Sequence, residues 1–269
     1  MTFHPGSTRG LATLLLSFAA GVHATSATAT IASTAVIYNA GASIRSGAIA
    51  VSASAKSVSF THVKGSLTSS AGTLCGSALG CILLNNRAGN SLNNPDGAGA
   101  ATSFSTNLGV NGISGIAGPG AGYLVGVFVP SGGPTGAPPA SLDFRSSGMG
   151  TSFAELSPLL DQAFFIGDGL TGNGSGSTQT FNVPAGASAL YLGISDACGY
   201  HGDPGCYADN LGSFNVTYIF SDLPANATAG FALLMLVCAG LASLVFLLGK
   251  SSYRRARAAV LDSSRQQRF

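Results

Sequence analysis

Short runs in which apolar and polar residues alternate occur along most of the chain. Residues 31–38 (IASTAVIY) and 47–60 (GAIAVSASAKSVSF) alternate as half-buried β-strands do. Further runs rich in β-branched and aromatic residues predict strands at 123–129, 162–166, 178–183, 189–195 and 213–220. Turn signals rich in glycine and proline, such as residues 94–97 (NPDG), separate these runs. Many short strands with such turns predict an all-β domain, a β-sandwich or jelly roll.

Three local features depart from this strand pattern. Residues 153–160 predict one short helix, because Ser152 and Glu155 have the spacing of a capping box and Pro158 limits its length. The sequence Gly-Asp-Gly at 167–169 predicts a hairpin turn. Residues 66–121 are rich in Gly, Ser and Asn, so we expect long surface loops there.

The N-terminus has the parts of a secretory signal peptide. A short, weakly basic start precedes the apolar run 11–20 (LATLLLSFAA), and residues 22–24 (VHA) have the small-residue pattern of a cleavage site. We therefore expect residues 1–24 to be a signal peptide and the mature chain to begin near Thr25. A short buried helix is the alternative interpretation.

The C-terminal region predicts a membrane anchor. Residues 227–249 carry no charge and are long enough to cross a hydrocarbon core of about 30 Å. Half of the 12 Lys and Arg residues follow in the tail, 250–269. Positively charged flanks stay cytoplasmic. We therefore expect 25–222 to be an exported ectodomain, 223–249 a transmembrane or sorting helix, and the tail to be cytoplasmic.

The charge balance changes once the terminal segments are set apart. The whole chain has a formal net charge of +2, but the exported segment carries five basic and nine acidic residues. A mildly acidic segment argues against nucleic acid as a partner. Only 8% of the residues are charged and Trp is absent, but about 200 residues are enough to bury the core of one β-domain.

Four of the five cysteines form two local pairs in the exported segment. The pairs are Cys75 with Cys81 and Cys198 with Cys206, and the fifth cysteine lies within the predicted membrane span. An even number of cysteines in an exported domain predicts disulfides, here Cys75–Cys81 and Cys198–Cys206. Zinc binding by Cys198, His201 and Cys206 is an alternative that an oxidising compartment disfavours.

The sequence shows little sign of a catalytic site. No Ser lies in a G-x-S-x-G elbow, and no two histidines have the H-E-x-x-H spacing. An enzyme acting on polysaccharide would need paired carboxylates. The candidate carboxylates are scattered along the chain, at Asp143, Glu155, Asp161 and Asp168. We therefore expect a protein that is not an enzyme.

One stretch concentrates oxygen ligands. The loop 196–210 (DACGYHGDPGCYADN) holds three of the ten acidic residues of the chain. Calcium prefers six to eight oxygens from carboxylates, amides and backbone carbonyls. Asp196, Asp209 and Asn210 would supply side-chain oxygens, and the tight Pro-Gly turn would aim a backbone carbonyl inward. The alternative is that these side chains only bond to their own backbone, as Asp and Asn in loops commonly do.

Residues 190–218 (LYLGISDACGYHGDPGCYADNLGSFNVTY) resemble the PA-IL family of small galactose-binding bacterial lectins. In those lectins a strand ending in Asn-Asp is followed by Pro-Gly-x-Tyr-x-Asn-Asn-Ser-Gly-Ser-Phe and the last strand. The resemblance implies a jelly-roll, galactose-binding-like fold with a calcium ion. Its implied ligands are the side chains of Asp196, Asp209 and Asn210 and the carbonyls of Cys206 and Phe60.

The same resemblance implies contacts to a sugar. The calcium of these lectins also holds two hydroxyls of galactose, which implies Asp196 and Asn210 as ligand-binding residues. The sugar-contacting motif His-Pro-Asp-Gln of the lectins is similar to residues 94–97 here, which adds Asn94 and Asp96. The His and Gln of that motif are replaced by Asn and Gly in this chain.

A second resemblance covers more of the sequence. Residues 107–129, 141–144, 159–196 and the C-terminal helix with its basic tail are similar to bacterial PEP-CTERM proteins. Those proteins are exported, processed at the membrane by an exosortase, and associated with extracellular polysaccharide. Residues 223–226 (LPAN) stand where Pro-Glu-Pro would be expected, so a plain membrane anchor without processing stays an alternative.

Together these patterns predict an exported protein of the cell envelope or cell surface. We expect its β-domain to bind calcium and, like a lectin, carbohydrate, either extracellular polysaccharide or a galactose-like glycan of the biofilm matrix. The alternative is a structural surface or matrix protein in which calcium and disulfides only stabilise the fold.

Overall fold

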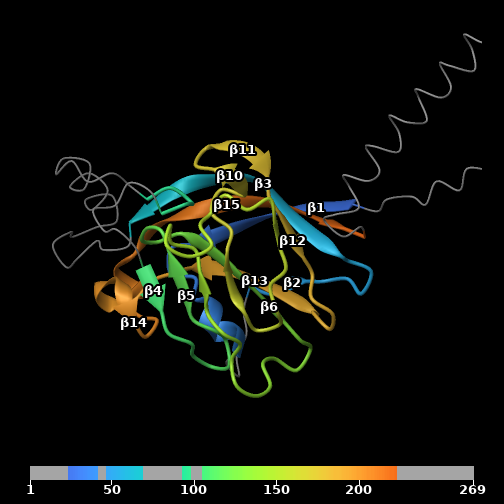
Figure 1. Cartoon of the computed structure of the whole chain (residues 1–269), viewed down its shortest axis with the longest axis horizontal. Coiled ribbons are helices and arrows are strands. Elements are labelled where there is room, and N and C mark those ends of the chain that lie inside the picture. Colours follow the sequence, from blue (N-terminus) through green and yellow to red (C-terminus); the bar gives the residue numbers. More distant parts are fainter. Residues whose placement is uncertain (1–23, 42–46, 69–92, 98–104, 223–269) are drawn as a thin grey trace, which may run out of the picture.

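Two β-sheets lie face to face in the computed structural model, which describes residues 24–41, 47–68, 93–97 and 105–222 (Figure 1). Helical structure in these ranges is confined to three short 3-10 turns, η1 (Ile37–Gly41), η2 (Cys198–Tyr200) and η3 (Tyr207–Asp209). The described chain is therefore all-β, as the alternating sequence pattern predicts.

The first sheet has five strands and contains the longest strand pairs. Its order is β1 (Ala24–Ala32), β15 (Leu211–Ser221), β3 (Ser57–Thr68), β12 (Thr180–Asn182) and β8 (Glu155–Leu156). The pairs are antiparallel except β12 with β8, which are parallel. The first and last described strands thus pair with each other over the whole of β1.

The second sheet has four strands and carries the acidic loop at one end. Its order is β2 (Ile49–Ala50), β13 (Ala189–Ile194), β6 (Leu124–Val129) and β9 (Ala163–Phe165). Every residue of β6 is buried, as expected for a central strand with both faces covered. Because all neighbouring strands are antiparallel, the ends of β13 and β9 and the start of β6 lie at the same end of this sheet.

Smaller elements complete the described structure. A third sheet has the order β14 (His201–Gly202), β4 (Ser105–Asn107), β5 (Ile116–Gly118) and β7 (Leu142–Asp143). A separate hairpin pairs β10 (Leu170–Gly172) with β11 (Ser175–Thr178) and lies above β3 in the view of Figure 1.

Aromatic side chains join the two large sheets. Phe164 of β9 stacks on Phe128 of β6, with ring centroids 5.4 Å apart. It also contacts Phe181 of β12 across the core, at 5.2 Å, and Phe181 meets Phe60 of β3 edge-on at 5.4 Å. All four rings are fully buried, so each contributes on the order of 2–3 kcal/mol of hydrophobic free energy.

A β-bulge in β3 changes which side chains of this strand face the core, from even-numbered positions before it to odd-numbered positions after it. Thr217 pairs with His62 and Tyr218 with Phe60, so Thr61 is the extra residue. On one side of the bulge Phe60 is buried, and on the other Val63 and Leu67 are buried. An extra residue shifts the two-residue period by one, which lets both halves of a long strand face the same core.

Five of the predicted strands are confirmed by β6, β9, β12, β13 and β15. The single strand predicted at 47–60 is wrong, because residues 49–50 form β2 and residues 57–60 begin β3, and these two strands lie in different sheets. The strand predicted at 31–38 is wrong, because β1 ends at Ala32 and η1 begins at Ile37. The helix predicted at 153–160 is also wrong, since this segment contributes β8 to the edge of the first sheet.

The Gly-Asp-Gly turn at 167–169 joins β9 to β10, which lie in different sheets, so the predicted hairpin there is wrong. The observed hairpin turns at Asn173 and Gly174 instead. The predicted loop region 66–121 contains the short strands β4 and β5 within its described part.

Several sequence predictions fall on residues outside the described ranges. They are the signal peptide, the Cys75–Cys81 disulfide, the helix at 223–249 and the basic tail. Within the described ranges, no helix has the length and apolar character needed to cross a membrane.

Candidate calcium site

The acidic loop 196–210 connects the two large sheets at one end of the domain. β13 ends at Ile194, and the N–H of Ser195 donates a hydrogen bond to the Tyr123 carbonyl at 3.2 Å. Asp196 follows directly, and Asn210 is the last residue before β15. Asp196 and Asn210, two of the predicted ligands, therefore lie at the two ends of the loop, next to the core strands that it connects.

A disulfide closes the loop. Cys198 and Cys206 are bonded, with their Cα atoms 5.1 Å apart, which confirms this predicted pair. In this bonded pair the two sulfurs are not available as the zinc ligands of the alternative interpretation. The Asp196 carbonyl also accepts a hydrogen bond from the Gly205 N–H at 3.3 Å, so the backbone closes at the same point.

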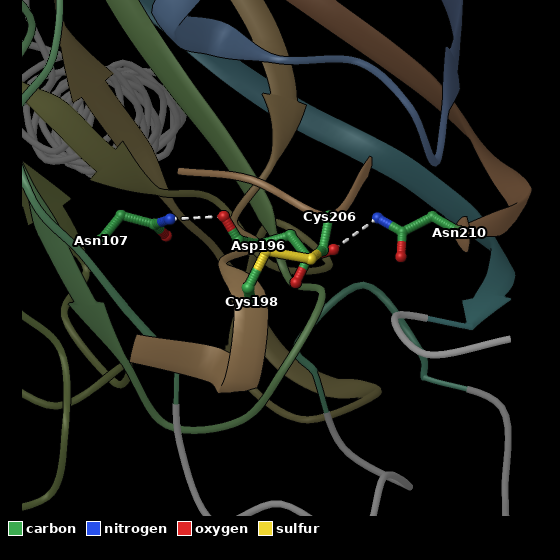
Figure 2. The surroundings of a disulfide bond; sticks show 5 residues. All are labelled: Asn107, Asp196, Cys198, Cys206 and Asn210. Atoms are coloured by element: carbon green, nitrogen blue, oxygen red, sulfur yellow. Dashed lines mark hydrogen bonds between the residues drawn. A yellow bond between two sulfur atoms is a disulfide. The ribbon is translucent and has the colours of Figure 1, made fainter. Parts of the chain in front are cut away.

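The Asp196 carboxylate is buried beside Asn210 (Figure 2). Only 1% of Asp196 and 3% of Asn210 are exposed. The Asn210 amide nitrogen donates to Asp196 Oδ2 at 2.7 Å and to the Ser33 carbonyl at 3.1 Å. Ser33 follows β1, so one amide group joins the two ends of the loop to a segment 177 positions away in the sequence.

Three oxygen atoms of this loop are buried without a hydrogen-bond partner in the described structure. They are Oδ1 of Asp196, Oδ1 of Asp209 and Oδ1 of Asn210. Burying a polar oxygen without a partner costs free energy, and most buried polar groups in proteins do have one. These three oxygens belong to the three side chains that the sequence predicts as calcium ligands.

The electrostatics of Asp196 also favour a cation. Burial raises the pKa of Asp196 to about 6, against an ordinary value of 3.8. Hydrogen bonds from Asn210 and from the Ala197 backbone lower this pKa, and the charge of Asp209 raises it. No positively charged side chain is among the described groups that shift this pKa. A divalent cation would supply the missing positive charge.

Asn107 supports the loop from β4, and the sequence interpretation did not identify it. Its amide nitrogen donates to the Asp196 carbonyl at 2.5 Å, and its side-chain oxygen accepts a short hydrogen bond from the Ser195 hydroxyl. Asn107 is buried and lies 89 residues before Asp196. No local pattern links two residues so far apart, so only the fold reveals this contact.

The two predicted carbonyl ligands differ in their positions. Cys206 lies in the loop with a left-handed φ of 60°, and its carbonyl accepts a weak hydrogen bond from the Asp209 N–H at 3.4 Å. A left-handed conformation is uncommon for a residue other than glycine. The disulfide and the adjacent η3 turn hold this one in place.

Phe60 is not brought to the loop. It pairs with Tyr218, whereas Leu211, which follows Asn210, pairs with Thr68. The eight residues that separate Phe60 from Thr68 correspond to roughly 25 Å along the strand. The Phe60 carbonyl lies against Gly169 instead.

Asn94 and Asp96 form a group beside β9 that does not include Asp196 and Asn210, the other two predicted sugar contacts. The Asp96 carboxylate accepts a hydrogen bond at Oδ1 from the Asp168 N–H at 2.8 Å. The Asn94 amide nitrogen donates to the Asn173 side-chain oxygen at 2.8 Å. Pro95 places this segment at the start of β6, since its carbonyl accepts the Leu124 N–H at 2.9 Å. The group shares the end of the sheet with Asp196 but is built around Asp168.

The donor set of the loop suits a hard cation. Across the described ranges, no three His, Cys, Asp or Glu side chains form a metal-binding group, so a site here depends also on Asn210 and on backbone carbonyls. Such mixed oxygen sets are those that calcium takes. Comparison of the chain with protein-family models, curated proteins and solved structures gave no match.

Proposed function

We propose that residues 25–222 form an exported surface domain that binds calcium through the loop 196–210. Asp196, Asp209 and Asn210 supply side-chain oxygens, and the Cys206 carbonyl completes the set within the loop. The supporting observation is that one oxygen on each of these side chains is buried without a partner. A calcium ion would give all three a common partner and would keep Asp196 ionised.

Calcium at this point would stabilise the connection between the sheets. The ligands lie where β13 ends and β15 begins, and Asn210 also holds the segment after β1. The ion would therefore connect the end of β13 in the second sheet to the start of β15 and to the segment after β1, which belong to the first sheet. The fold proposed for this arrangement is a jelly roll, in agreement with the resemblance to galactose-binding lectins.

Carbohydrate binding on the ion is the second candidate function. It is favoured by the resemblance of residues 190–218 to lectins in which calcium holds two sugar hydroxyls. The burial of Asp196 and Asn210 favours a structural ion instead, because a sugar needs open coordination positions. We therefore place calcium-dependent stability first and calcium-dependent sugar binding second.

The proposed cellular setting rests on two sequence patterns near the ends of the chain. A signal peptide at 1–24 and a helix at 223–249 with a basic tail would export the domain and anchor it at the cell surface. The similarity to PEP-CTERM proteins supports sorting by an exosortase and a role beside extracellular polysaccharide. No catalytic chemistry is proposed.

Calorimetric titration with calcium tests this function. The full-length protein, purified in detergent and freed of calcium by chelation, is titrated beside Asp196→Asn and Asp203→Asn. Asp203 is an exposed carboxylate of the same loop, so its variant is the matched control. We expect one calcium ion to bind to the unmodified protein and to the control, but not to Asp196→Asn. Equal binding by all three, or no binding at all, would refute the proposal.

A further inference from the structure

The first and last described strands meet at one end of the first sheet. Ala24, the first residue of β1, pairs with Ser221, the last residue of β15, and the two strands lie side by side from there (Figure 1). The calcium loop precedes Leu211 at the other end of β15. The 11 residues of β15 correspond to roughly 35 Å of strand. The two regions are therefore at opposite ends of this strand, and we call the first of them the Ser221 end.

The sequence that follows β15 limits how far the Ser221 end can lie from a membrane. The last described residue is Asp222, and the uncharged run of the proposed anchor begins at Ala227. The chain between these two positions spans at most about 18 Å when it is fully extended. Part of this length crosses the headgroup layer, so the Ser221 end stays within about 13 Å of the headgroups. The inference below rests on this part of the proposed function, the anchor.

Three consecutive large apolar residues lie at the Ser221 end of β15. Tyr218, Ile219 and Phe220 are all half-buried, whereas Phe214 and Val216 of the same strand are buried. Because side chains alternate between the two faces of a strand, Tyr218 and Phe220 share the core face, and Ile219 lies on the other face. This end of the sheet therefore has partly exposed apolar side chains on both faces.

The neighbouring strand β1 covers these three side chains only in part. Tyr218 lies opposite Ala27, and Ile219 lies opposite Ser26. Both neighbours are short, so they shield little of a large ring or of a branched side chain. The rings of Tyr218 and Phe220 contact each other edge-on, with centroids 5.8 Å apart, and pack against the margin of the core. Part of each ring stays open to the surroundings.

The polar groups around this aromatic pair suit a layer of lipid headgroups. The Lys56 N–H donates to the Ser221 carbonyl at 2.8 Å, so the exposed Lys56 lies at the same end. The Asp222 carboxylate accepts a hydrogen bond from the Ser54 hydroxyl at 2.9 Å. Neither β1 nor β15 contains a charged residue. Aromatic rings with a polar tip favour the interface between headgroups and hydrocarbon, and lysine extends its charge toward the headgroups.

We propose that the Ser221 end lies on the outer surface of the membrane, with Tyr218 and Phe220 at the level of the lipid headgroups. The partner of this surface is the lipid bilayer that carries the anchor, and Lys56 lies beside its headgroups. Contact at this end directs the opposite end of β15, with the calcium loop, away from the membrane. The inference deepens the proposed function, because it sets the orientation in which the surface domain presents its ion site.

Tryptophan fluorescence in lipid vesicles tests this contact, because the chain itself contains no Trp. Phe220→Trp and Tyr218→Trp each place a single reporter at the proposed contact, and Leu108→Trp is the matched control. Leu108 is 59% exposed, and its N–H donates to the Gly202 carbonyl of the calcium loop at 2.8 Å. Each full-length variant is reconstituted into phosphatidylcholine vesicles with or without bromine near the headgroup end of the acyl chains. Bromine quenches Trp only on contact, so a short tether alone gives no signal.

We expect brominated lipid to reduce the emission of Phe220→Trp and Tyr218→Trp about twofold or more, as for rings at the membrane interface, and to leave Leu108→Trp unchanged. Two reporters are used so that a folding defect in one does not spoil the test. Equal emission with and without bromine for both would overturn the inference. A blue-shifted emission without quenching would do the same, since another protein surface, such as a second copy of the chain, would then cover the rings. Equal quenching of Leu108→Trp would also overturn it, because the domain would have no preferred orientation.

Two further measurements separate this inference from the proposed function. Flotation of the vesicles after an alkaline wash tests the anchor, and a protein that does not float with them would overturn the anchor and the inference together. A protein that floats but shows no quenching would overturn the inference alone. Calcium titration of the same preparations tests the ion site. Phe220→Trp should keep its calcium affinity, because the calcium loop lies at the other end of β15.

Discussion

Asp196 and Asp96 are two carboxylates of similar protonation behaviour at the same end of one sheet. Burial is the main cause that raises the pKa of each to about 6. Asp196 follows β13, and Asp96 lies beside the start of β6 and accepts the N–H of Asp168, which follows β9. Each carboxylate has one buried oxygen without a hydrogen-bond partner in the described ranges.

The two carboxylates differ in their neighbours. Asp196 lies next to Asn210 and near Asp209, whose side chains also have unpaired buried oxygens, in a loop closed by a disulfide. Asp96 lies at a pocket with an amide, a hydroxyl and apolar side chains. A raised pKa alone therefore does not identify a site. The surrounding groups decide whether a cation fits.

The largest expected effect is a pH dependence that Asp196 contributes to the calcium-free protein. The folded-state pKa of about 6 exceeds the ordinary value of 3.8, so between these values the folded state holds a proton that the unfolded state has released. Stability should therefore fall as pH rises through this window, by about 3 kcal/mol for Asp196. Denaturant unfolding in EDTA at pH 4 to 8 measures it.

Substitutions at each carboxylate distinguish the contributions of Asp196 and Asp96 to the pH dependence of stability. Asp196→Asn and Asp96→Asn should each reduce the pH dependence and stabilise the calcium-free protein at pH 7, because each removes a buried charge. Calcium should abolish the Asp196 contribution and leave that of Asp96 in place. A pH dependence that neither substitution changes would contradict the burial of both charges.

Removing the disulfide should destabilise the calcium loop and spare the Asp96 pocket. Cys198 and Cys206 are separated by 8 positions, for which the chain-entropy model gives about 2.5 kcal/mol. The double variant Cys198→Ser and Cys206→Ser should lose this amount in chemical unfolding and bind calcium more weakly. The pH dependence contributed by Asp96 should be unchanged in the same variant, whereas its loss would join the two regions into one unit. An unchanged free energy of unfolding would contradict the stabilising role of the disulfide.

The smallest of the expected effects concerns Asn107. Asn107→Ala leaves the Asp196 carbonyl without its side-chain donor, which should cost about 1–2 kcal/mol of stability. It should also lower the calcium affinity, since the carbonyl and the carboxylate belong to the same residue. Asn39→Ala, at an exposed position, is the matched control. Equal unfolding free energies for the two variants would show that Asn107 does not support the loop.

Local sequence patterns correctly predicted strands in which buried residues alternate with exposed ones or follow one another without a break. The run at 123–129 became β6, and the acidic loop was identified because it concentrates Asp, Asn and Cys. The helix predicted at 153–160 failed because sheet pairing of Leu156 with Phe181 overrode a capping pattern. The Asn-Gly at 173–174 is a strong hairpin signal that the interpretation of the neighbouring Gly-Asp-Gly overlooked.

Contacts between distant segments could not be predicted from one sequence. The support of Asp196 by Asn107 and of Asn210 by Ser33 depends on which strands become neighbours. The position of Phe60 depends on the register of β3 with β15, which a single bulge residue alters. The pocket at Asp96 likewise combines four segments that no local pattern connects.

The most direct test of the calcium site is thermal unfolding of the full-length protein with calcium and with EDTA. At a calcium concentration of about 100 times Kd, binding should add about 2.7 kcal/mol, which raises the midpoint by about 5–10 °C in a domain of this size. Asp203→Asn should show the same rise and Asp196→Asn none. Identical midpoints with and without calcium, or an undiminished rise in Asp196→Asn, would contradict the site.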